Sequence, residues 1–185
     1  MSRAYKISIL LLCVILFAAT GCTSSQVRLR YVPAATTQIS PEIQPGNTFG
    51  LIQFADKRTA SNIGIDDGKN LTPVSNVAAW VTHGIEQKLQ QNGATVHYVL
   101  NASQLENTSV RVSGSITKLW VQHISAGKYQ GDITLKVKIN NNPPTTYTAS
   151  VTRQGVPYMN NIEPLLAELL NEALTPVIPQ ILAAQ

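Results

Sequence analysis

Hydrophobic and polar residues alternate most regularly near the end of the chain. Apolar residues occupy every second position in 133–139 and again in 147–151, with Thr, Lys and Ser between them. A period of two is typical of a strand with one buried face. The short segment 140–144 joins these runs, so we expect them to pair antiparallel. In the preceding run, 110–124, the apolar positions change phase near Lys118, which predicts a β-bulge or a bend there.

Two other segments have the helical period. Apolar residues recur three and four positions apart in 77–89 and in 162–174, which predicts two amphipathic helices. Ser75 or Asn76 can cap the first helix, and Gly93 follows it as a left-handed stop.

The remaining segments complete the predicted fold. Residues 48–55 are apolar on both faces and 94–100 alternate, so both should be strands, whereas the Gly- and Asn-rich segment 56–73 has neither period and should be a long loop. Because the apolar faces of the helices and of the sheet can be buried against one another, we expect an α+β fold. It should contain a mainly antiparallel sheet of about five strands, with two amphipathic helices packed on one face.

The first residues have the form of an export signal. Arg3 and Lys6 precede an apolar run at 7–19, which is shorter than the roughly 20 residues that span a bilayer. The run ends in Ala19-Thr20-Gly21-Cys22, which resembles the lipobox of bacterial lipoproteins. That resemblance implies cleavage before Cys22 and transfer of diacylglycerol to its sulfur, with palmitate among the acyl chains. The alternative is an ordinary secretory signal that leaves Cys22 free.

This interpretation divides the chain into three parts. They are a lipoprotein signal peptide at 1–21, the lipidated Cys22 with a Ser-, Thr- and Pro-rich tether at 22–47, and a single α+β domain at 48–185. Within the tether, Val27, Leu29 and Tyr31 alternate with two arginines, which is compatible with a short edge strand before Pro33. Thr23, rather than Asp, follows the cysteine. By resemblance to the sorting rule of enteric bacteria, this favours the periplasmic face of the outer membrane, with a lipid anchor in the inner membrane as the alternative.

Charge excludes one class of partner. The chain has 14 basic and 10 acidic residues, and removing the two basic residues of the signal leaves a formal charge of +2. Nucleic-acid-binding domains carry a much stronger basic patch, so we expect no nucleic-acid partner.

No residue pattern indicates catalysis or metal binding. The histidines at 83, 97 and 123 lack the spacing of a zinc motif, and the Asp66–Asn70 segment lacks the closing Glu of an EF-hand calcium loop. The sequence also lacks a Gly-x-Ser-x-Gly nucleophile elbow. We therefore expect a protein that is not an enzyme and that needs no metal or cofactor.

Four other residues are candidates for structural or interaction roles. Trp80 and Trp120 could line a groove, although Trp on a helix stripe or at a strand end is more often a core residue. Asp56 and Arg58 follow the apolar run at 48–55, where they form either a solvated strand end or a structural pair.

The lipobox, the strand ending in Ala55-Asp56-Lys57-Arg58-Thr59, and the helix closing with Leu89 to Gly93 resemble the YajG family of small bacterial lipoproteins. The resemblance implies no enzymatic role. It maps the family's Asp-x-Arg element onto Asp56 and Arg58, which would pin the following loop rather than react.

These inferences favour a non-catalytic lipoprotein of the cell envelope. It would be held on the membrane by lipid on Cys22 and would act as a binding or structural subunit of an envelope assembly. The alternative is a periplasmic carrier or chaperone for a lipid, glycan or other small molecule, with Trp80 and Trp120 in a cleft between helices and sheet.

Overall fold

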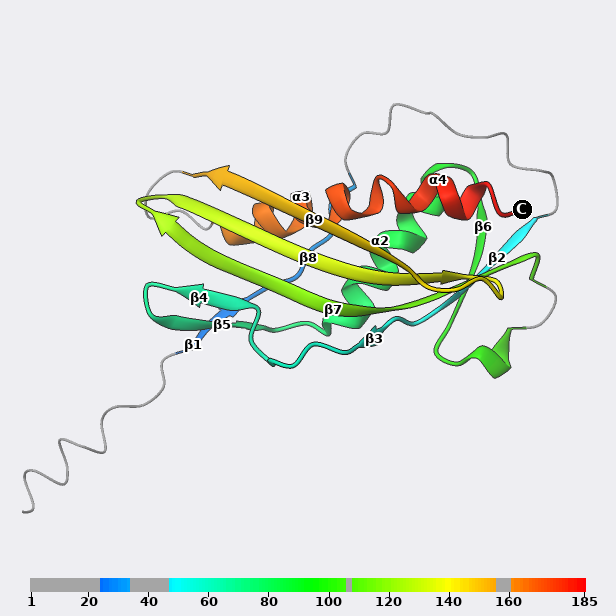
Figure 1. The fold of residues 1–185 in the computed structure, drawn as a ribbon, viewed down its shortest axis with the longest axis horizontal. Helices are drawn as coiled ribbons and strands as arrows, with labels where there is room; N and C mark the ends of the chain where they lie inside the picture. The colour runs from blue at the N-terminus through cyan, green and yellow to red at the C-terminus, as the bar shows by residue number, and fades with distance from the viewer. Residues whose placement is uncertain (1–23, 34–46, 106–107, 156–160) are drawn as a thin grey trace, which may run out of the picture.

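The fold is a mixed sheet with helices on one of its faces (Figure 1). The computed structural model describes residues 24–33, 47–105, 108–155 and 161–185. In these residues nine strands form a single sheet with both parallel and antiparallel pairs. The prediction of about five mainly antiparallel strands is therefore wrong.

The three long strands nearest the C-terminus pair antiparallel with one another. Strands β7 (Val110–Ser125), β8 (Lys128–Ile139) and β9 (Thr145–Gln154) pair in chain order. The register of β7 against β8 shifts between Ile116 and Lys118, so the predicted bulge is confirmed. Alternation succeeds here because one face of each strand is buried and the other meets solvent.

The other edge of β7 explains the error in the predicted sheet type. Three short strands, β2 (Thr48–Ile52), β3 (Ala55–Asp56) and β4 (Gly64–Asp66), pair with β7 one after another, and all run parallel to it. Strand β6 (Thr95–Val99) is also parallel to β2. Helix α2 (Val77–Gln91) lies between β2 and β6 in the chain, and a helical crossover returns the chain in the same direction.

The predicted loop at 56–73 is largely a β-hairpin. Strand β4 pairs antiparallel with β5 (Lys69–Pro73) across a turn in which Asp67 and Gly68 both have positive φ. Gly64 fits because it has no side chain: a Cβ there would lie 1.9 Å from the carbonyl oxygen of Val121. Backbone pairing rather than alternating apolar residues defines this hairpin, so the hydrophobic pattern did not predict it.

A further strand lies at the start of the described chain. Strand β1 (Ser24–Val27) pairs parallel with β5 at one edge of the sheet. It falls inside the 22–47 segment predicted as a tether. Residues 1–23 and 34–46 of the predicted signal and tether lie outside the described residues.

The helices cover the inner face of the sheet. The Asn76 side chain caps α2 by accepting a hydrogen bond from the Ala79 N–H at 3.1 Å, and Gly93 follows the helix with φ of 86°. Helix α3 (Ile162–Leu174) packs on β8 and β9, and α4 (Val177–Leu182) packs on α2 and α3. A short 3₁₀ helix, η1 (Ala102–Gln104), follows β6.

The core lies between this inner face and the helices. Its fully buried side chains come from both layers, including Leu51, Ile85, Ile133, Leu135, Leu165 and Leu166. Among the described residues, the segment Ile162–Leu182 is long and apolar enough to cross a membrane. However, 61% of its 18-residue apolar window is buried inside the domain. Burial against the sheet accounts for its apolar character.

Candidate functional site

The predicted site residues are distributed over several parts of the chain. Cys22 lies outside the described residues, and its lipidation stays a prediction. Asp56 and Arg58 are brought together at the end of β3, whereas Trp80 and Trp120 are held apart.

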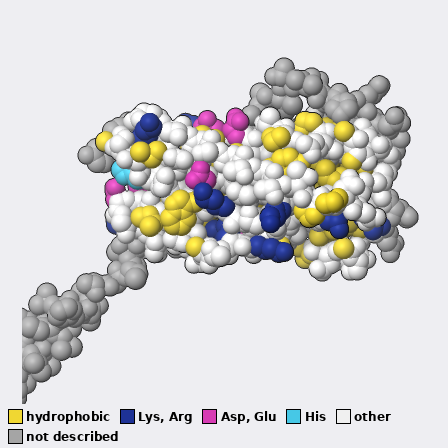
Figure 2. Space-filling model, viewed as in Figure 1, with side chains coloured by type: hydrophobic (Ala, Val, Ile, Leu, Met, Phe, Trp, Pro, Cys, Tyr) yellow, Lys and Arg dark blue, Asp and Glu magenta, His cyan; other side chains and the backbone are white. Residues whose placement is uncertain are grey.

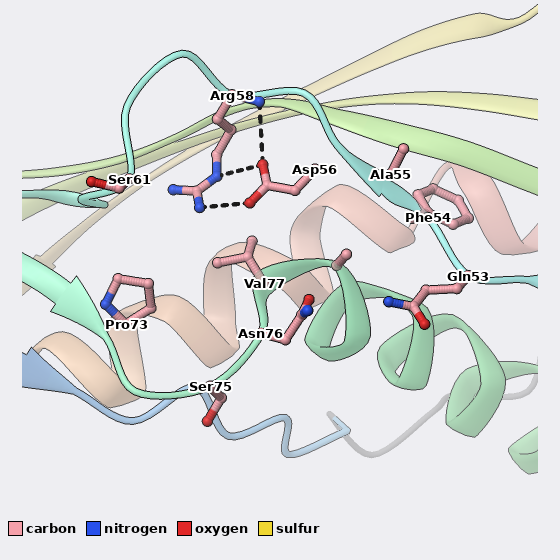
Figure 3. A pocket seen from close by; sticks show the side chains of 11 residues that line it. Gln53, Phe54, Ala55, Asp56, Arg58, Ser61, Pro73, Ser75, Asn76 and Val77 are labelled. Atoms are coloured by element: carbon pink, nitrogen blue, oxygen red, sulfur yellow. Dashed lines mark hydrogen bonds and ion pairs between the residues drawn. The ribbon is translucent and has the colours of Figure 1, made fainter. Parts of the chain in front are cut away.

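Asp56 and Arg58 form a two-pronged ion pair (Figure 3). Arg58 Nε donates to Asp56 Oδ1 at 2.9 Å, and Nη2 donates to Oδ2 at 2.8 Å. The Arg58 backbone N–H also donates to Oδ1 at 3.2 Å, while Nη1 donates to the Asn62 carbonyl at 3.2 Å. These contacts join the end of β3 to the residue before Ile63, which is buried in the core.

The electrostatics of this pair suit a structural role. Hydrogen bonds from Arg58 lower the pKa of Asp56, although partial burial acts in the opposite direction. The Arg58 side chain is only 7% exposed, and three of its nitrogens already donate. Such a guanidinium holds the 57–62 segment in place but offers little to an incoming ligand.

A shallow cleft lies beside the pair. It has a volume of about 520 Å³, is open to solvent and separates the β3 end from the start of α2. Its polar groups are already engaged in part, because the Gln53 amide oxygen accepts from Tyr98 and Asn76 caps α2. The cleft therefore offers a small polar surface rather than a set of groups arranged for proton transfer. The lining residues are Gln53, Phe54, Ala55, Asp56, Arg58, Ser61, Pro73, Ser75, Asn76, Val77 and Ala78.

The two tryptophans lie on opposite sides of the sheet. Trp80 is 5% exposed and belongs to the core beneath α2. Trp120 is partly exposed and lies between Leu119 and Val121, which point into the core, so its ring is on the outer face. The cleft with both tryptophans that the carrier hypothesis requires is therefore not formed.

Around Trp120 the outer face carries a polar network. Trp120 pairs in register with Asp132, whose Oδ2 accepts from Lys118 Nζ at 3.1 Å. Gln130 Nε2 donates to Asp132 Oδ1 at 3.4 Å and to Ser150 Oγ at 3.3 Å. Partial burial raises the pKa of Asp132, but hydrogen bonds from Ser150, Lys118 and Gln130 outweigh it, so the pKa lies below its ordinary value.

One cluster was missed by sequence reasoning. Asp66, Asp67 and His123 place ligand-type atoms within 4.8 Å of one another. His123 Nδ1 lies 2.9 Å from Asp67 Oδ1, its ring stacks on Tyr129 at 4.8 Å, and the Tyr129 hydroxyl donates to Asp66 at 3.1 Å. The contacts tie the β4–β5 turn to the end of β7. Asp67 and His123 are 56 residues apart in the chain, so local spacing could not reveal them.

Comparisons with known proteins show similarity of fold alone. The sequence matches no protein-family model and no curated protein sequence. The structure is similar to an uncharacterized protein (TM-score 0.51, 12% identity), covering 86% of this chain and 99% of that one. It is also similar to a DUF330 protein of Xanthomonas campestris (TM-score 0.49, 12% identity), covering 86% of this chain and 93% of that one. A minor lipoprotein of Acinetobacter baumannii has a TM-score of 0.44 at 13% identity, with 74% of this chain and 91% of that one covered.

Proposed function

We propose that the protein is a non-catalytic lipoprotein of the cell envelope, anchored by lipid on Cys22 at the periplasmic face of the outer membrane. It acts there as a binding or structural subunit. The observation that carries the binding role is the uncovered outer face of β7, β8 and β9, in which Trp120 lies within a polar network.

The two faces of these strands differ in what covers them. The inner face packs against α3. On the outer face, the described residues of β8 and β9 that lie between the buried ones are polar and partly or fully exposed. In the view of Figure 2, Lys and Arg side chains gather across the middle, with hydrophobic side chains toward both ends. An aromatic ring among hydrogen-bonding groups suits a protein or glycan partner, because it combines apolar area with directional contacts.

The carrier alternative receives less support from the described residues. Buried side chains fill the space between the helices and the sheet where a ligand would lie, and Trp80 is among them. We keep membership of the YajG family as part of the proposal, because the Asp56–Arg58 pair has the geometry expected for pinning the following loop.

The first experiment tests the anchor. Wild-type protein and Cys22→Ser are expressed in bacteria with labelled palmitate and then fractionated after a high-salt wash. We expect label and membrane retention for the wild type, because acyl-chain burial is insensitive to salt. Cys22→Ser should remain an unlabelled, uncut precursor. Recovery of unlabelled wild type as soluble periplasmic protein would refute the lipoprotein assignment.

The second experiment tests the binding face. A photo-reactive amino acid replaces Thr134 or Thr148 on the outer face, and Glu172 on the exposed side of α3 serves as the control. Irradiation of cells should give the same discrete adduct from both outer-face positions and none from position 172. The adduct is identified by mass spectrometry and confirmed by crosslinking from the partner. Equal or diffuse labelling from all three positions would contradict the proposal.

A further inference from the structure

Strand pairing places the start of the described chain at one particular end of the sheet. Residues that pair in register on neighbouring strands form a row, which runs through β1, β5, β4, β7, β8 and β9 in turn. This row therefore crosses the sheet from one edge to the other. Its members are Ser24, Asn70, Ile65, Gln122, Gln130 and Thr152.

Two turns extend beyond this row. Strand β1 runs away from this end, so Ser24, where the described chain begins, lies at the same end of the sheet as the β4–β5 turn at 66–69 and the β7–β8 turn at 123–128. In Figure 1 the start of β1 and both turns lie at the same end of the sheet, on the left, with the β4–β5 turn nearer to β1. We call these two turns the anchor end.

The chain between the lipid and the sheet is very short. Cys22 precedes Ser24 by two positions, and two residues span at most about 7 Å. The headgroup layer on one side of a bilayer is itself roughly 5–8 Å thick. A lipid on Cys22 would thus hold Ser24 at the membrane surface, with no tether to lift the domain away.

The anchor end has side chains suited to that position. Ile65 is 42% exposed and Ile124 is 48% exposed, while Lys69 and Lys128 flank the two turns. The Asp66 carboxylate accepts a hydrogen bond from Tyr129, and the Asp67 carboxylate lies 2.9 Å from His123 Nδ1, although the Asp67 side chain is 77% exposed. Apolar side chains with cations beside them match the acyl boundary and the lipid phosphates respectively. Single exposed apolar residues are common on any surface, so the inference depends on their position at the same end of the sheet as Ser24.

We infer that the anchor end lies in the headgroup layer of a phospholipid bilayer, with Ile65 and Ile124 against the acyl boundary. This inference rests on the proposed lipidation of Cys22. The opposite end of the 16-residue β7 would then project up to about 50 Å from the bilayer, at a rise of about 3.3 Å per residue. The outer face of β7, β8 and β9 would then be roughly perpendicular to the bilayer plane and accessible to other envelope proteins.

Site-directed labelling of the lipidated full-length protein tests the orientation. The mature chain has no cysteine besides Cys22, so Ile124→Cys, Arg30→Cys and Asn141→Cys each introduce a single thiol. They report on the anchor end, the β1 edge and the far end. The labelled proteins are reconstituted in vesicles of phosphatidylethanolamine and phosphatidylglycerol, and a fluorophore on each thiol is quenched by lipids with spin labels near the headgroup. We expect quenching at 124 to exceed that at 141 about fivefold.

The outcomes separate the two claims. Quenching mainly at 30 would show that the domain lies on its β1 edge, and equal quenching at all three positions would show free tumbling, so either result overturns the inference while leaving lipidation intact. Absence of fatty acid on Cys22 would overturn both.

A lengthened linker gives an independent check. Ten Gly and Ser residues inserted between Thr23 and Ser24 should release the domain, so quenching at 124 falls about fivefold toward the value at 141 while membrane retention is unchanged. The same insertion in the 140–144 turn is the control and should leave quenching at 124 as in wild type. Unchanged quenching at 124 after the linker insertion would show that the short segment between Cys22 and Ser24 does not hold the anchor end at the membrane.

Discussion

The two faces of the β7–β9 strands share a backbone but have different roles. The inner face is continuous with the core, and Ile133, Leu135 and Val137 are at most 2% exposed beneath α3. On the outer face, Lys136 and Lys138 are exposed between the same residues. Burial of apolar area stabilises the fold, whereas exposed polar groups contribute little net free energy. The difference indicates that side chains of the outer face can be substituted without unfolding the domain.

The largest expected effect contrasts neighbouring positions of β8. Leu135→Ala should lower the free energy of unfolding by about 2–5 kcal/mol, because it leaves a cavity in a fully buried site. Thr134→Ala, one position away on the outer face, should change it by less than about 0.5 kcal/mol. Urea denaturation followed by circular dichroism measures both values. Similar losses for the two variants would show that the faces are not energetically distinct.

A smaller effect tests how closely the inner face is packed. A Cβ on Gly114 would lie 2.4 Å from both the Lys136 carbonyl oxygen and the Phe54 ring. Gly114→Ala should therefore destabilise the domain by about 1–3 kcal/mol through overpacking. Thermal unfolding checks this, and Phe54→Leu in the same background should recover part of the loss. A neutral Gly114→Ala would mean that this part of the sheet is loosely packed.

The smallest effect belongs to the outer-face network. Asp132 has a depressed pKa in the fold, so its contribution to stability is present above the unfolded pKa and is lost as the pH falls through the folded value. Asp132→Asn should reduce stability at pH 7 by less than about 1 kcal/mol, since Lys118 is half exposed. Unfolding curves of variant and wild type should converge once the pH has fallen below the lowered pKa that Asp132 has in the folded protein. A difference that persists in acid would contradict this account.

Sequence reasoning succeeded where one local pattern determined the element. Alternation predicted β8 and β9, the phase change predicted the bulge near Lys118, and Asn76 with Gly93 bounded α2. The same alternation could also have placed Trp120 on the outer face, because Leu119 and Val121 have the opposite phase.

Sequence reasoning failed where strand pairing depends on residues far apart in the chain. Strand β3 has only two residues, and β4 depends on Gly64 packing against the β7 backbone. No periodicity can be measured in segments so short. The Asp56–Arg58 contact was recognisable because its partners are two residues apart, whereas the His123–Asp67 contact depends on the fold.

The long strand β7 also sets the order in which the domain can assemble. The three strands β2, β3 and β4 all use one edge of β7, yet they precede it in the chain. While the chain is being made, these three strands lack this partner until the β7 residues that pair with them, 110–122, have followed. Hairpins β7–β8 and β8–β9 need only local loop closure, so they should form first and act as the template. During that interval the N-terminal half exposes unpaired strand edges, which is when the chain is most prone to aggregate.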